Sequence, residues 1–221
     1  MGMDIEHVSV TALKSQVRDK SRVNVFIDGA YRFSLDITQV ADLGIKTGNR
    51  YTLDELAELE NESQFGKLYT RSLEYSLVRP RSVREMRDYL YRKARNTRTK
   101  EGAVKKGVSK ELTERVFNRL VEKGYIDDMR FARFWVENRN LRKGSSLRRL
   151  TAELRGKGVS NDIIHQVTDE SERTDTEELR KVIAKKASRY SDQNKLIAYL
   201  QRQGFRYDDI RQALNEEPDE A

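Results

Sequence analysis

The side chains in this sequence that could do chemistry are cations, and they concentrate in its middle. Residues 64–170 carry 26 Lys or Arg against 14 acids, whereas residues 1–63 and 171–221 are slightly acidic. Guanidinium and ammonium groups bind phosphates or carboxylates, and binding that they dominate weakens with salt. The basic middle predicts a partner such as DNA, RNA or an acidic protein face, although a basic helical surface can also be merely solvated. The candidate contacts are Arg79, Arg81, Arg84, Lys93, Arg142, Lys143, Arg148, Arg149 and Lys157.

The sequence offers no recognisable pattern for catalysis, cofactor binding or metal binding. It has no cysteine, and nothing places either of its two histidines beside a nucleophile. Gly102 and Gly107 have the glycine spacing of a phosphate-binding loop, but Val108 stands where that motif needs a lysine. Asp127 and Asp128 are interpreted as helix caps, because no further ligand spacing accompanies them. We therefore assign no catalytic residue, no cofactor and no metal.

A repeated helical pattern must position the cations. The segment Leu147–Val167 has leucines at helical spacing, then Gly158-Val159-Ser160, then a second apolar set. The same pattern recurs 46 residues later, and its first set also occurs 64 residues earlier, starting at Val83. We expect the glycine, which is Gly107 in the first copy, to end one helix in the left-handed conformation. The serine that follows, such as Ser109, is then expected to cap the next helix.

The repeats predict the fold class and most of the domain boundaries. We expect one further helix before the two helices of each copy, so each module contains three short helices. The expected modules are residues 64–128, with an insertion at 95–107, residues 129–170, and residues 171–221 with an acidic tail. The insertion is rich in cations and poor in apolar residues, which predicts an exposed segment or a mobile hairpin tip. The predicted fold is mainly α, an elongated tandem array of three three-helix modules.

The start of the chain has a different pattern. Val, Ile, Phe and Tyr alternate with polar residues in two segments of residues 8–37, which predicts strands. Asp28-Gly29 lies between two of these strands and is typical of a tight hairpin turn. Thr52 is expected to cap an acidic helix over residues 53–60. We therefore predict a small β-rich N-terminal domain over residues 1–63.

Three short motifs in the helical part resemble those of a known family. They are Arg79-Pro80-Arg81-Ser82, the run Leu120–Ala132 and Lys157-Gly158-Val159-Ser160. Together with the repeated modules, they make Leu68–Leu214 similar to the RecX family, regulators of the RecA recombinase. The residues of the family signature are Gly124, Tyr125, Ile126, Asp127, Asp128, Phe131 and Ala132. These residues also have structural interpretations, since the glycine can end a helix, the aspartates can cap one and the apolar residues can pack.

The resemblance implies a function that composition alone does not. It implies a non-enzymatic protein that lies along the groove of a RecA filament on DNA and restrains strand exchange, ATP turnover and co-protease activity in DNA repair and the SOS response. Its partners would be the RecA filament and DNA, contacted directly or through RecA. The insertion at 95–107 is longer than the usual first module suggests, and the β-rich N-terminus lies outside the core resemblance.

Two other functional classes remain open on the residues alone. The chain could be a general DNA- or RNA-binding protein that uses basic helical modules, with salt-steep binding to naked nucleic acid as its signature. An enzyme acting on nucleic acid would need clustered acids and a divalent ion. With no cysteine and no long apolar run, a cytoplasmic protein without a membrane segment is expected. We also expect the protein to be a monomer.

Overall fold

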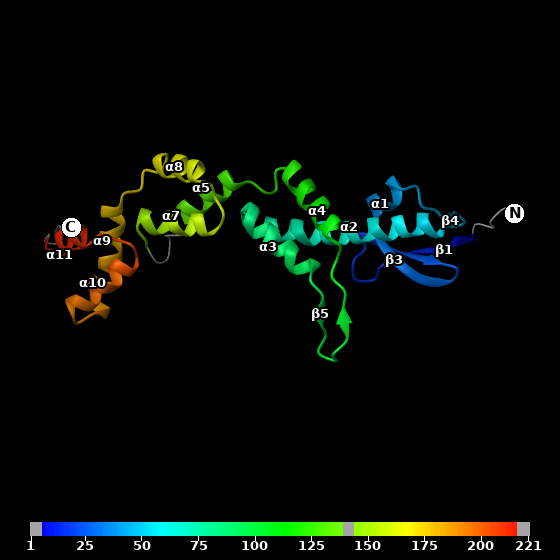
Figure 1. The fold of residues 1–221 in the computed structure, drawn as a ribbon, viewed down its shortest axis with the longest axis horizontal. Coiled ribbons are helices and arrows are strands. Elements are labelled where there is room, and N and C mark those ends of the chain that lie inside the picture. Colours follow the sequence, from blue (N-terminus) through cyan, green and yellow to red (C-terminus); the bar gives the residue numbers. More distant parts are fainter. Residues whose placement is uncertain (1–5, 139–143, 216–221) are drawn as a thin grey trace. The chain divides into compact units, whose positions relative to one another are not determined.

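The computed structural model describes residues 6–138 and 144–215. The described chain begins with an antiparallel sheet and continues mainly as helices (Figure 1). The described residues form two compact units. The first contains the chain up to Val78 and the segment Arg87–Tyr125, and the second contains Arg79–Met86 and the chain from Ile126 onwards. Helix α3 (Val83–Ala94) is therefore shared, with its first turn in the second unit and the remainder in the first.

The sheet of the first unit has the strand order β3-β2-β1-β4. Its strands are β1 (His7–Ser15), β2 (Arg22–Ile27), β3 (Ala30–Asp36) and β4 (Arg50–Thr52). The β2–β3 hairpin turns at Asp28 and Gly29, which have φ of 48° and 85°. These positive values are those that a tight turn requires, so the predicted hairpin is confirmed. Val10, Val25 and Leu35 are buried on one face of the sheet and form the sheet side of a hydrophobic core.

Helix α2 (Leu53–Leu77) covers that face (Figure 1). Thr52 caps it as predicted, in a reciprocal capping box with Glu55. The helix expected over residues 53–60 is too short, because α2 continues without interruption through the predicted domain boundary at residue 63. The hydroxyl of Ser63 is buried and donates to the carbonyl of Ser34 at 2.8 Å, so this polar position faces the sheet. The connection between β3 and β4 contains a short helix, α1 (Ile37–Asp42).

The insertion at residues 95–107 is an antiparallel hairpin. Its strands are β5 (Thr97–Arg98) and β6 (Val104–Lys105), and it connects α3 to α4 (Lys110–Glu122). Figure 1 shows it projecting away from these two helices. The prediction for Gly107 is wrong: it does not have a positive φ and does not end a helix. Glycine is needed there because a Cβ atom would collide with the carbonyl of Ala94, where the chain enters the hairpin.

The second unit contains two successive groups of three helices. They are α5 (Asp128–Asn138), α7 (Leu147–Gly156) and α8 (Asn161–Asp169), then α9 (Asp175–Lys186), α10 (Gln193–Arg202) and α11 (Tyr207–Asn215), with a 3-10 turn η1 (Ala187–Arg189) after α9. Each group buries its own apolar core. Gly158 and Gly204 have φ of 83° and 96°, as predicted for the glycines that end α7 and α10. None of the described helices is long and apolar enough to cross a membrane.

Candidate functional site

The paired aspartates of the signature are helix caps, as predicted, but they cap two different helices. The carboxylate of Asp127 accepts hydrogen bonds from the amides of Met129 (2.7 Å) and Arg130 (3.0 Å), in the first turn of α5. Asp128 reaches across to α3 and accepts from the amide of Val83 at 2.8 Å. Burial raises the pKa of Asp128, partly offset by this bond. Asp128 therefore connects the start of α5 to the start of α3.

The same arrangement recurs between the second and third groups. Asp175 is the first residue of α9, as Asp128 is of α5, and its carboxylate accepts from the amide of Leu147, the first residue of α7, at 2.7 Å. The capping serines repeat as well. The hydroxyl of Ser82 donates to the carbonyl of Lys157 at 2.8 Å, and that of Ser146 to the carbonyl of Gln203 at 3.3 Å.

We call these two sets of contacts the module junctions. The first module junction comprises Ser82, Val83, Glu85, Asp128 and Lys157, and the second comprises Ser146, Leu147, Arg149, Asp175 and Gln203. The capped helices are 64 residues apart, which is the spacing of the sequence repeat. The repeat therefore extends beyond the three-helix groups to the contacts that join them.

Two of the predicted contact cations neutralise a carboxylate at the first module junction. Arg79 donates to both carboxylate oxygens of Glu85, at 2.9 and 3.0 Å, and Lys157 donates to Glu85 at 2.8 Å. The Arg79 guanidinium lies 5.9 Å from the ring centroid of Phe131, and the Lys157 ammonium lies 5.4 Å from that of Trp135. Burial alone would raise the pKa of Glu85, but the hydrogen bonds and charges of Arg79 and Lys157 lower that pKa overall.

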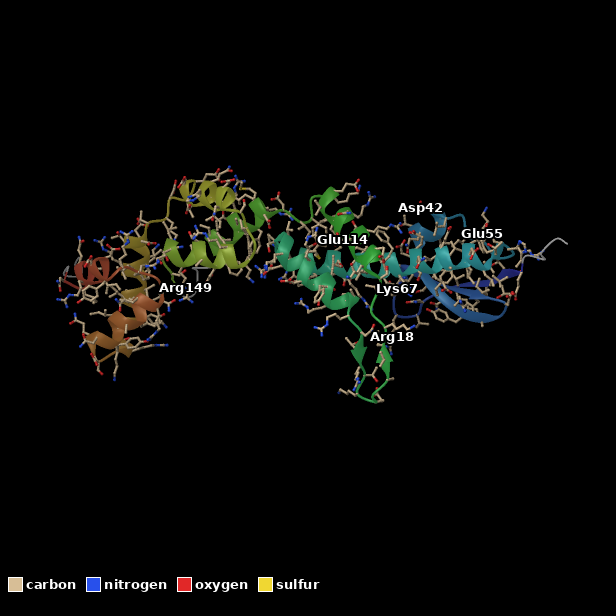
Figure 2. All side chains as sticks on the ribbon, viewed as in Figure 1. Arg18, Asp42, Glu55, Lys67, Glu114 and Arg149 are labelled. Carbon is tan, nitrogen blue, oxygen red and sulfur yellow. The ribbon has the colours of Figure 1, made fainter. Side chains whose placement is uncertain are left out.

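Two further candidates also hold the junctions. Arg81 lies 3.9 Å from the same carboxylate, and its side chain is only 12% exposed. Arg149, on α7 (Figure 2), donates to the carbonyl of Arg202 at 2.7 Å and to the side chain of Gln203 at 2.9 Å. It also lies 3.3 Å from Glu153. These guanidinium groups are occupied by internal acceptors, so a partner would have to displace those acceptors to bind them.

The remaining described candidates face solvent. Arg84 and Arg148 are the second residues of α3 and α7, they occupy equivalent positions 64 residues apart, and both are exposed. Neither forms an ion pair with a residue of the described ranges. Lys93 is also exposed and lies 4.9 Å from the ring centroid of Tyr89. The predicted contacts Arg142 and Lys143 lie outside the described residues.

Reasoning from sequence missed the acceptors of the junctions. No motif in the sequence singles out Glu85 or Gln203, although they lie close to the repeated residues Val83 and Gly204. The available signal was the repeated spacing itself, because Ser82 and Ser146 are 64 residues apart, as are the helices that they cap. Among the described residues, no group of three His, Asp or Glu side chains is arranged to hold a metal ion.

The fold defines a class of protein with an N-terminal sheet followed by tandem three-helix domains joined through repeated contacts. Three family models match the sequence: the N-terminal domain of the regulatory protein RecX at residues 8–51, the second three-helix domain of RecX at 127–167 and the third at 174–214. The chain belongs to the RecX family of regulatory proteins. The expectation that the β-rich N-terminus lies outside the resemblance is wrong, because a RecX model covers its sheet.

Curated relatives named regulatory protein RecX align with most of the chain. The protein of Lactobacillus johnsonii is 31% identical over 166 residues, which are 73% of this chain and 56% of the relative, so the chain spans little more than half of that protein. The protein of Bacillus licheniformis is 27% identical over 94% of this chain and 76% of its own length. That of Caldanaerobacter subterraneus is 29% identical, over 90% of this chain and 95% of its own length.

Two solved structures share the fold. A crystal structure of regulatory protein RecX has a TM-score of 0.65 and 19% identity, and the match covers 95% of this chain and 100% of that one. RecX from Lactobacillus salivarius has a TM-score of 0.50 and 22% identity, over 68% of this chain and 94% of its own. At these identities the likeness concerns the fold alone.

Proposed function

We propose that this protein is a non-enzymatic modulator of the RecA recombinase. It binds along the RecA–DNA filament and restrains strand exchange, ATP turnover and co-protease activity, and so acts in DNA repair and the SOS response. The observation that carries the proposal is membership of the RecX family of regulatory proteins, in a chain whose junctions repeat. We further propose that the three modules at 64–128, 129–170 and 171–221 form an elongated array in a monomeric cytoplasmic protein.

The repeated junctions give this proposal a physical basis. Asp128 and Asp175 fix the start of α3 and α7 in the same way. The exposed guanidinium groups of Arg84 and Arg148 therefore recur at one position of successive modules. A filament presents the same anionic groups, protein carboxylates or DNA phosphates, at each of its repeats. Each surface contact is weak, but linkage raises the effective concentration of the next one, so a repeated array suits a repeated partner.

The test is a charge reversal that spares the junctions. Arg149 serves as a junction residue, so the informative variant is Arg84→Glu/Arg148→Glu. The control, Arg206→Glu/Arg211→Glu, makes the same charge change at exposed positions just before and within α11. RecA-catalysed strand exchange and ATP hydrolysis on single-stranded DNA are measured against increasing protein. We expect the first variant to need at least about tenfold more protein for half of the wild-type effect, and the control to behave as wild type.

Two results would contradict the proposal. Wild-type protein in molar excess that leaves RecA strand exchange and ATP turnover unchanged would refute it directly. Equal affinity for bare and RecA-coated DNA would instead favour the alternative, a general DNA- or RNA-binding protein without a filament partner. A large preference for coated DNA supports the RecA modulator.

A further inference from the structure

One short segment of the chain has a net positive charge equal to that of the whole protein. Residues 92–110, which we call the basic hairpin, carry eight Lys or Arg and one acid, a balance of +7. The formal net charge of the whole protein is also +7, so the other residues contain 35 cations and 35 acids. The segment comprises the end of α3, the strands β5 and β6, and the first residue of α4. Of the eight cations in this segment, only Lys93 is among the proposed RecA contacts.

The cations of the basic hairpin share the same surroundings. All eight are exposed, and none forms an ion pair with a residue of the described ranges. Several arginines on the neighbouring helices of the same unit are paired with acids. Arg87 bonds Glu114, which is labelled in Figure 2, at 3.0 Å, and Arg115 bonds Glu62 on α2. With Glu101 as the single acid of residues 92–110, the basic hairpin has almost no carboxylate of its own to pair with its cations.

The hairpin is held at its base by defined contacts. The amide of Val108 donates to the carbonyl of Lys93 at 3.1 Å, and the amide of Gly107 donates to the side chain of Asn96 at 2.9 Å. At its tip, the amide of Gly102 donates to the carbonyl of Thr99 at 3.0 Å, in a turn where Gly102 has a φ of 85°. The basic side chains thus stand on a two-stranded ribbon with a fixed base and a closed tip.

We propose that the basic hairpin is a binding site for double-stranded DNA. A two-stranded ribbon fits the major groove of B-form DNA, where cations on both strands face the phosphates that border the groove. Residues 92–110 contain no aromatic side chain, whereas sites for single strands rely on aromatic rings that stack on bases. Their threonines and asparagine can donate to phosphate oxygens as well. The site needs no RecA, and so it is independent of the filament contacts proposed above.

The experiment compares two full-length variants that lose the same charge. In the hairpin variant, Arg98, Lys100, Lys105 and Lys106 are replaced by Gln, and in the matched control, Arg189, Lys195, Arg206 and Arg211 are replaced by Gln. All of the replaced residues are exposed. Binding to a labelled duplex of about 20 base pairs, and to one of its strands alone, is followed by fluorescence anisotropy between about 50 and 200 mM salt.

We expect the hairpin variant to bind the duplex at least about tenfold more weakly than wild type. Its slope of log affinity against log salt should be shallower by about 0.9 for each phosphate that the variant no longer neutralises. The affinity of the control for the duplex should stay within about threefold of wild type, because salt screens charges that lie far from the bound DNA. Circular dichroism should show the same helix content in all three proteins.

Three outcomes would overturn the inference: wild-type protein that does not bind the duplex, an equal loss in both variants, or a loss confined to the single strand. If acidic polypeptide competes for the hairpin as well as duplex DNA does, a protein partner replaces DNA and the inference also fails. RecA assays on the same variants separate this site from the filament contacts. A hairpin variant that still restrains strand exchange in full would leave the proposed function intact.

Discussion

Removing a charge from the first module junction should destabilise the protein more than removing an exposed charge. In the variant Glu85→Gln, the negative charge is lost and one carboxylate oxygen becomes an NH2 group, so Arg79 and Lys157 lose their counter-charge and keep a single acceptor oxygen between them. Glu85 has a side chain that is only 10% exposed, whereas those of Arg79 and Lys157 are 26% and 35% exposed. Removing one partner of a fully buried ion pair costs about 3–5 kcal/mol, because the other charge stays buried and unpaired. Solvent reaches both cations here, so we expect a loss of about 2–3 kcal/mol.

The single tryptophan of the chain provides the assay. Trp135 lies within 5.8 Å of the Arg79 guanidinium, measured from the ring centroid, so its fluorescence reports on the second unit as urea unfolds the protein. With a urea dependence of about 1–3 kcal/mol per molar, the midpoint should fall by about 0.7–3 M. The control is Glu170→Gln, which removes an exposed partner of Arg133 in the same unit and should leave the midpoint unchanged.

The pH dependence gives an independent check. Because the folded-state pKa of Glu85 lies below its ordinary value, the junction contributes its stability above the unfolded pKa of about 4.3 and loses it as the pH falls through the folded pKa. Wild type should lose this contribution in acid, and Glu85→Gln should not. If Glu85→Gln and Glu170→Gln shift the urea midpoint equally, or if both proteins lose the same stability below pH of about 4.3, the reasoning about the junction is refuted.

The remaining predictions concern the second module junction and are measured by urea unfolding followed by circular dichroism. Gly204→Ala should cost about 2–3 kcal/mol, since the new methyl group combines positive-φ strain with a collision against the Ser146 hydroxyl, whereas Gly124→Ala, with open space around it, should cost only about 1 kcal/mol. Equal losses would contradict the close packing of the junction. Asp175→Ala should cost about 1 kcal/mol through the lost cap on Leu147, but Asp175→Asn should cost less, because an amide oxygen still accepts and burial raises the pKa of the native carboxyl. An equal cost for the two changes would show that the cap contributes nothing.

Local chemistry allowed much of the fold to be predicted. Asp28-Gly29 requires a turn because both residues tolerate positive φ, and Thr52, Ser109 and Ser160 cap their helices by bonds to amides only three residues away. These interactions are specified by neighbours in the sequence, so the sequence pattern is sufficient to predict them.

Features that depend on distant partners could not be predicted in the same way. Helix α2 continues past residue 60 because Ser63 and Gly66 pack closely against the sheet and α1, yet small polar residues of this kind are also typical of loops. Whether a cation is free or paired depends on acids far along the chain, as for Lys157 and Glu85, which are 72 residues apart. The predicted contact set therefore mixed residues that hold the structure with residues that face solvent.

The two module junctions share a backbone pattern but differ in their charges, and this difference bears on how the chain avoids misassembly. Glu85 and Arg149 occupy equivalent positions, as do Lys157 and Gln203, so one junction is an ion pair and the other joins an arginine to a neutral amide. Repeated segments risk docking on the wrong neighbour during folding. If α7 took the place of α3, Arg149 instead of Glu85 would face Lys157, and two like charges would replace the ion pair. The difference in charge thus disfavours docking of α7 in the place of α3.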